Sequence, residues 1–123
     1  MNKKIFIIDD EKHVVELTKN ILSKRGYLIE TFENGEQALM ALKDHRPDLI
    51  ILDNLLPGEN GYKICHEIKS QSPNKHIPVL LTTGQIQTDE SFDEYENLIK
   101  PDDYLIKPFE IEDLIERVEK LLL

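Results

Sequence analysis

Three short apolar runs, each ending abruptly at a charged residue, constrain the fold of this chain more than any other feature. They cover residues 5–8 before Asp9, residues 49–52 before Asp53 and residues 104–106 before Lys107. Each run is followed by a helical pattern of apolar positions, which is typical of buried strands in a parallel sheet. Ligand sites in such sheets form beyond the carboxyl ends of the strands, so the three charged ends are predicted to meet at one site.

Two further apolar runs, at residues 27–32 and 78–83, complete an alternation of strands and helices. The helices are predicted after the first strand with Val14, Leu17, Ile21 and Leu22 on the buried face, from Asn34 to before Pro47, at 62–70, within 88–99 and at 111–122. Right-handed crossovers between the strands then favour a doubly wound α/β fold. We therefore expect a five-stranded parallel sheet in the flavodoxin-like order 2-1-3-4-5, with helices on both faces.

Length and composition narrow the class of protein. A chain of 123 residues suits one domain, 1–123, with a single sheet core. The formal net charge of -9 argues against direct binding to a nucleic-acid backbone. The lone Cys65 excludes an internal disulfide and is predicted to be a small buried residue. The sequence shows no secretory or membrane-spanning segment, so we expect a cytoplasmic protein without membrane partners.

The predicted site combines three carboxylates, Asp9, Asp10 and Asp53, with one ammonium, Lys107. Crowded carboxylates repel one another unless a cation lies among them, and hard oxygen ligands suit Mg²⁺. A structural reading competes with this one, because Asp9 or Asp10 is also suited to cap the first helix. The four histidines are scattered without ligand spacing, so a transition-metal site is not expected.

Five motifs, in this order, resemble the receiver domains of bacterial two-component response regulators. They are Ile8-Asp9-Asp10-Glu11, Leu52-Asp53, Pro57-Gly58, Pro78-Val79-Leu80-Leu81-Thr82-Thr83 and Tyr104-Leu105-Ile106-Lys107-Pro108-Phe109. The resemblance covers nearly the whole chain and implies a phosphorylation-activated switch rather than an enzyme with a separate substrate. It implies that Asp53 is the phosphoacceptor, which takes a phosphoryl group from a phosphohistidine on a sensor kinase or phosphotransfer protein.

The resemblance also implies how the metal would be held. Asp10 would bind Mg²⁺ directly, and Asp9 would hold it through water. Asp53 and the backbone carbonyl of Leu55 would complete the protein ligands.

The remaining implied roles concern the phosphoryl group and the switch. Lys107 would pair with Asp53 and then with a phosphoryl oxygen, and the Lys107-Pro108 bond is expected to be cis. Thr83, rather than Thr82, would donate its hydroxyl to the phosphoryl group once it arrives. Tyr104 would then turn from solvent toward the core, which would change the surface offered to a downstream partner.

Three departures from the family pattern are visible, one of which is Lys100-Pro101 where a Gly-Ala pair commonly precedes the fifth strand. Asn54 follows the phosphoacceptor at a position where a hydrophobic residue is usual. Thr83 and Lys107 are 24 positions apart, about two more than this fold's loop-helix-loop connection leads us to expect. The downstream partner is left open: it is either another protein or an output domain outside these 123 residues.

Two other functions also stay open. A Mg²⁺-dependent phosphatase that forms an aspartyl phosphate would want a second acid two residues after its nucleophile, where this chain has Leu55. A flavin-binding flavodoxin-like module would want a phosphate-cradling loop where Asp9 and Asp10 would repel a phosphate. One equivalent of phosphate from a small acyl-phosphate donor would support the switch, many turnovers the phosphatase, and a yellow protein the flavin module.

Overall fold

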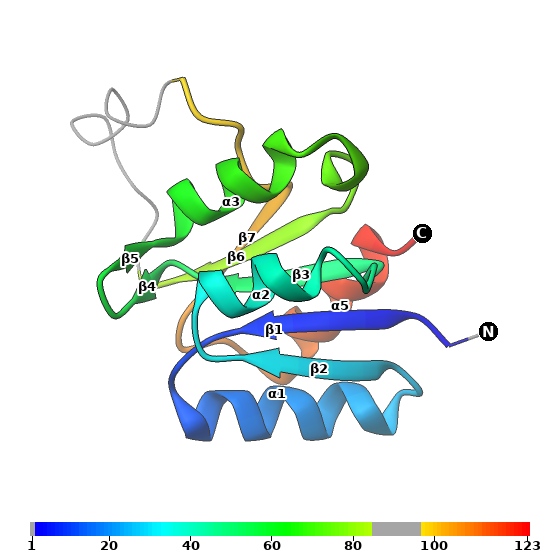
Figure 1. Ribbon diagram of the computed structural model, residues 1–123. Coiled ribbons are helices and arrows are strands. Elements are labelled where there is room, and N and C mark those ends of the chain that lie inside the picture. Colours follow the sequence, from blue (N-terminus) through cyan, green and yellow to red (C-terminus); the bar gives the residue numbers. More distant parts are fainter. Residues whose placement is uncertain (1, 85–96) are drawn as a thin grey trace.

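A five-stranded parallel sheet in the order β2-β1-β3-β6-β7 forms the centre of the computed structural model, which describes residues 2–84 and 97–123 (Figure 1). Its strands are β1 (Lys4–Ile8), β2 (Leu28–Phe32), β3 (Leu49–Asp53), β6 (Val79–Thr83) and β7 (Asp103–Ile106). All four ladders between neighbouring strands are parallel. The predicted order 2-1-3-4-5 is confirmed, because β6 and β7 are the fourth and fifth strands of this sheet in chain order.

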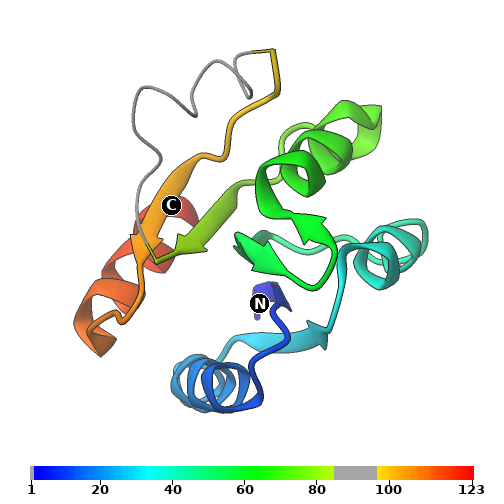
Figure 2. The same ribbon diagram turned by 90° about the vertical axis from the view of Figure 1, so that its left-hand side faces the viewer.

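Helices cover both faces of the sheet (Figure 2). Helices α1 (Lys12–Lys24) and α5 (Ile111–Leu121) pack on one face, and α2 (Gly35–Ala41) and α3 (Gly61–Ser70) pack on the other. The side chains of each strand alternate between the two faces, which divides the buried residues into two clusters. β3 and β6 are buried along their whole lengths, as expected for central strands with helices on both sides.

Short polar residues and one glycine set several helix boundaries. The Asn34 side chain accepts a hydrogen bond from Gln37 N at 2.9 Å and caps α2, and the Asn60 side chain accepts one from Tyr62 N at 2.8 Å and caps α3. Gly26 follows α1 with a φ of 94°, a conformation that ends a helix and suits glycine. None of the helices in the described ranges has the length and apolar character needed to cross a membrane.

The loop predicted around Pro57 and Gly58 contains a small hairpin. β4 (Leu55–Leu56) pairs antiparallel with β5 (Glu59–Asn60), and Gly58 in the turn between them has a φ of 68°. Glu59 Oε1 also accepts a hydrogen bond from Gly35 N at 3.1 Å, which ties the hairpin to the first turn of α2. A 3-10 turn, η1 (Ser72–Asn74), follows α3.

The predicted inward face of α1 was right for Ile21 and Leu22 but wrong for Val14 and Leu17. Thr18 and Leu22 are its buried residues, and Val15 packs against the same core cluster, whereas Leu17 is 49% exposed. The helical pattern was ambiguous because α1 carries apolar residues on more than one face, and Thr18 is buried although it is a polar residue type.

The expected helix cap by Asp9 or Asp10 is not observed. The N-cap of α1 is Glu11, which makes no side-chain capping hydrogen bond, and Asp9 Oδ1 instead accepts from Glu11 N at 2.9 Å. The helix predicted within 88–99 falls mostly on residues 85–96, which lie outside the described residues.

Candidate functional site

Strand register brings the predicted site residues to one edge of the sheet. Ile8 pairs with Leu52, so Asp9 follows β1 at the level where Asp53 ends β3. Asp53 pairs with Thr82. Thr83 in turn pairs with Ile106, and Lys107 N donates to Thr83 O at 2.8 Å. The three runs identified in the sequence therefore do end at one place.

Carboxylate oxygens of Asp9, Asp10 and Asp53 all lie within 4.8 Å of one another. Asp9 and Asp53 are buried, and Asp10 is exposed, so the cluster opens to solvent on one side. A set of three carboxylates with one open side is the hard-oxygen arrangement that Mg²⁺ prefers, because this ion keeps several of its waters. The donor set therefore fits the predicted metal, and the Leu55 backbone lies beside it, with Leu55 N donating to Asp53 Oδ1 at 3.3 Å.

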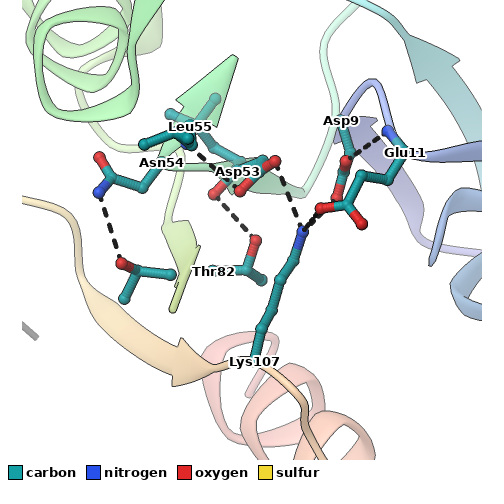
Figure 3. Close-up of polar contacts among 9 residues, drawn as sticks. Asp9, Glu11, Asp53, Asn54, Leu55, Thr82 and Lys107 are labelled. Carbon is teal, nitrogen blue, oxygen red and sulfur yellow. Dashed lines mark hydrogen bonds and ion pairs between the residues drawn. The ribbon is translucent and has the colours of Figure 1, made fainter. Parts of the chain in front are cut away.

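The Lys107 ammonium lies among three acids (Figure 3). Its Nζ is 3.0 Å from Asp9 Oδ2, 3.3 Å from Glu11 Oε1 and 3.4 Å from Asp53 Oδ2. The peptide bond between Lys107 and Pro108 is cis, as expected. The predicted pairing of Lys107 with Asp53 is present, although Asp9 is the nearer partner.

Burial and crowding shift the protonation of the site. Burial, and then the charge of Asp9, raise the pKa of Asp53 from 3.8 to about 6, although the Lys107 charge and the Leu55 N–H oppose the rise. Burial alone would lower the pKa of Lys107, but its hydrogen bond to Asp9 and the charges of Asp9 and Asp53 hold that pKa above the ordinary value. Asp53 is therefore an anion at neutral pH, held at a cost that a cation would reduce.

The two threonines at the end of β6 have different surroundings. Thr82 Oγ1 donates to the Leu52 carbonyl at 3.5 Å. Thr83 Oγ1 accepts from Asn54 Nδ2 at 3.4 Å, and Thr83 lines the groove that contains Asp53. Both threonines are buried. The side chain predicted to meet a phosphoryl group thus borders the acceptor's groove and contacts the residue that follows Asp53.

Gly61 allows the chain to pass close behind the acceptor. Its N–H donates to Asn54 O at 2.8 Å. A Cβ at this position would lie 2.6 Å from Asn54 Cα and 2.8 Å from Asp53 O, both of them backbone atoms. The absence of a side chain at residue 61 is therefore what lets the start of α3 support the end of β3.

An open groove of about 630 Å³ runs over this site. The polar part of its lining consists of Glu11, Asp53, Asn54, Thr83 and Lys107, and apolar side chains from three segments surround them. These apolar residues are Val14, Leu17, Leu55, Pro108 and Phe109. Leu17 and Leu55 are 49% and 80% exposed, so the rim of the groove offers apolar surface to solvent.

Tyr104 is half-buried on β7 and packs against the core cluster on the α2 and α3 face. Its ring centroid lies 6.4 Å from that of Tyr62. Burial raises the pKa of Tyr104, and a hydrogen bond with the Tyr62 side chain partly opposes that rise. The predicted turn of Tyr104 from solvent toward the core would therefore start from a position already in contact with it.

Two features of the site were missed or left unused in the sequence. Glu11, which immediately follows the acid pair, contributes the third carboxylate beside Lys107, and its place next to Asp10 was a usable signal. The contact between Asn54 and Thr83 depends on strand register, and no local pattern announces it. Cys65 is buried and burial raises its thiol pKa to about 12, as expected for a packing residue.

Comparison with protein families gives a match to the response regulator receiver domain over residues 5–119. Among curated relatives, the alkaline phosphatase synthesis transcriptional regulatory protein PhoP of Bacillus subtilis is 37% identical over 123 residues, which are 99% of this chain and 49% of the relative. The probable transcriptional regulator ycf27 of Cyanidium caldarium is 35% identical over 96% of this chain and 45% of its own length. The chain thus spans about half the length of these relatives.

Solved structures give the same result. A putative response regulator from Chloroflexus aurantiacus has a TM-score of 0.87 and 33% identity, covering 99% of this chain and 98% of its own. The chemotaxis response regulator CheY4 of Vibrio cholerae has a TM-score of 0.87 and 26% identity, covering 99% of this chain and 100% of its own.

Proposed function

This chain belongs to the response regulator receiver domains, which act as phosphorylation-dependent signalling switches, and from that premise we propose that Asp53 is the residue that takes the phosphoryl group. The observation that supports this most directly is the position of Asp53. Asp9 and Asp53 are both buried, pair with Lys107 and accept a backbone N–H, but Asp53 is the one of these two that lines the groove together with Thr83 and Lys107. Because the pKa of Asp53 is about 6, the carboxylate is ionised at neutral pH and can act as a nucleophile.

The transfer reaction needs positioning and charge neutralisation more than covalent chemistry from the protein. A carboxylate oxygen of Asp53 forms a bond to phosphorus while the bond from phosphorus to the partner's imidazole nitrogen breaks, which leaves an aspartyl phosphate. Lys107, already between Asp9 and Asp53, would pair with a phosphoryl oxygen. Thr83 would donate its hydroxyl to another.

We propose that Mg²⁺ is held by Asp9, Asp10, Asp53 and the backbone carbonyl of Leu55. When bound, the ion would neutralise charge on the carboxylates and on the transferring phosphoryl group. The mutual approach of three carboxylates supports this assignment, and the same crowding, together with burial, raises the pKa of Asp53.

We further propose that the phosphoryl donor is a histidine side chain presented by another protein, a sensor kinase or a phosphotransfer protein. The apolar rim formed by Val14, Leu17, Leu55, Pro108 and Phe109 supports a protein donor, because a small phosphorylated metabolite would need few such contacts. Such a donor belongs to the cytoplasm, which is where we place this protein. A downstream protein or a linked output domain would then respond to the phosphorylated form, with no separate substrate turned over.

The test is uptake of phosphate from a small acyl-phosphate donor in the presence of Mg²⁺. One acid-labile phosphate per chain is expected, located on Asp53 by peptide mapping and absent from Asp53→Asn. Phosphate found on Asp9, Asp10 or a histidine would refute the assignment. Repeated turnover of foreign phosphate esters would instead indicate a phosphatase.

A further inference from the structure

The carboxamide of Asn54 is buried beside the acceptor and is only half satisfied. Its Nδ2 donates to Thr83 Oγ1 at 3.4 Å, and its Oδ1 has no hydrogen-bond partner within the part of the chain that the structure describes. Only 8% of the residue is exposed. A buried polar atom without a partner lowers stability, and a well-packed apolar side chain of similar shape would avoid that loss. The position therefore retains a costly group that packing does not require.

The surroundings of Asn54 limit what this group can do. Its backbone is held on both sides, with N donating to Thr82 O and O accepting from Gly61 N, each at 2.8 Å. Asn54 lies in the bend that follows β3 and lines the same groove as Asp53. Its carboxamide is neutral and cannot replace the Asp53 carboxylate as an acceptor, and its Nδ2 contacts the Thr83 hydroxyl.

We propose that Asn54 is a positioning residue that holds the Thr83 hydroxyl in its unphosphorylated position and so opposes the change that a phosphoryl group induces. This inference rests on the proposed function, in which Thr83 turns to meet a phosphoryl oxygen on Asp53. Part of the free energy gained when the phosphoryl group binds would then be used to break the contact between Asn54 and Thr83.

The distances indicate which contact prevails. At 3.4 Å, the bond from Asn54 to Thr83 is longer than a usual N–H···O bond and correspondingly weak. A hydroxyl bond to an anionic phosphoryl oxygen is shorter and about twice as strong as a neutral one. The contact of Thr83 with the phosphoryl group is therefore favoured over its contact with Asn54. Asn54 reduces the free-energy difference between these two positions of Thr83, and a ligand shifts such an equilibrium only by its difference in affinity for the two states.

The test replaces Asn54 with an apolar residue of similar shape. Beryllium fluoride with Mg²⁺, which mimics a phosphoryl group, is titrated by calorimetry into the full chain and into Asn54→Leu. Asn54→Leu is expected to bind the mimic about three- to tenfold more tightly, the factor that loss of one modest hydrogen bond in the free protein implies. Asn54→Met serves as a second variant if the leucine side chain does not fit.

A double-mutant cycle with Thr83→Val shows whether Asn54 acts through the Thr83 hydroxyl. The valine keeps the shape of threonine without the hydroxyl, so the gain from Asn54→Leu should vanish in the Thr83→Val background. An equal gain in both backgrounds, no gain, or weaker binding by Asn54→Leu would overturn the inference. Absence of mimic binding by the unmodified protein would instead overturn the proposed function, and this inference with it.

Discussion

Replacing Asp53 with asparagine should make the metal-free protein more stable at neutral pH, although it removes the acceptor. Burial and the Asp9 charge move the Asp53 pKa from 3.8 to about 6. That change in pKa means that ionisation of the Asp53 carboxyl lowers the free energy of unfolding by about 3 kcal/mol. Asparagine has nearly the same shape and no charge, so most of this loss should be recovered.

The sign of the pH dependence follows from the direction of the shift. Below pH 3.8 the carboxyl is protonated in the folded and unfolded chains alike, and its contribution to stability is fully present. Between 3.8 and about 6 the unfolded chain loses the proton first, so the free energy of unfolding of the unmodified protein falls as pH rises. Above about pH 6 the advantage of Asp53→Asn should level off. Since Lys107 keeps Asp9 and Glu11 as partners, loss of Asp53 should subtract little from this gain.

The assay is urea unfolding followed by circular dichroism, with a chelator present, between pH 4 and 8. Asp53→Asn should exceed the unmodified protein by about 2–3 kcal/mol at pH 8 and by little at pH 4. Asp44→Asn, an exposed carboxylate away from the site, controls for the change in net charge and should shift stability by less than about 0.5 kcal/mol. An advantage of Asp53→Asn that is the same at both pH values, or absent at pH 8, would refute the argument. Saturating Mg²⁺ should narrow the gap, because the ion stabilises only the protein that binds it.

Asp10→Asn should weaken Mg²⁺ binding at least tenfold while leaving the melting temperature of the metal-free protein level or higher, because it removes repulsion from the cluster; unchanged Mg²⁺ affinity by calorimetry would contradict the metal assignment. Asp9→Asn should slow phosphorylation by a small donor without abolishing it, and complete loss of labelling would mean that Asp9 has a larger role than we assign. Leu17→Lys should reduce the rate of transfer from a kinase several-fold and leave small-donor phosphorylation intact, because Leu17 lies on the exposed rim of the groove; equal loss with both donors would point to misfolding. Thr83→Ala should still be phosphorylated on Asp53. Beryllium fluoride should change amide exchange at residues 97–104 in the unmodified protein but not in this variant. If the variant kept that change, Thr83 would be excluded as the coupling residue.

The features that sequence predicted correctly are those with a strong local signal. A buried parallel strand reads as a short apolar run, and five such runs in alternation with helices leave few topologies once crossovers are right-handed. The convergence of Asp9, Asp53 and Lys107 followed because parallel strands share one carboxyl edge. Local patterns also placed the start of a helix at Asn34, which caps α2, and Cys65 in the core.

The features that sequence did not predict depend on contacts between distant segments. Both Val14 and Val15 are apolar, and only packing decides that Val15 faces the core while Val14 lines the groove. The pairing of Glu11 with Lys107 and the bond between Asn54 and Thr83 arise from strand register. The bond between Asn54 and Thr83 leaves no trace in local composition or spacing, whereas the place of Glu11 beside the acid pair was a signal that could have been used.

The close approach of Gly61 to the backbone at Asp53 limits the substitutions that residue 61 can tolerate during evolution. In a saturation mutagenesis survey, residue 61 should be as intolerant as the acceptor itself, because any Cβ there meets the backbone of residues 53 and 54 at 2.6–2.8 Å. Variants at residue 61 should nevertheless differ from variants at Asp53 when protein abundance and signalling are measured separately. Substitutions at 61 should lower both scores, whereas Asp53→Asn should remain abundant while losing the signal. A selection that scored signalling alone would count Gly61 among the reactive residues, although it contributes close backbone packing and one backbone hydrogen bond and takes no part in the chemistry.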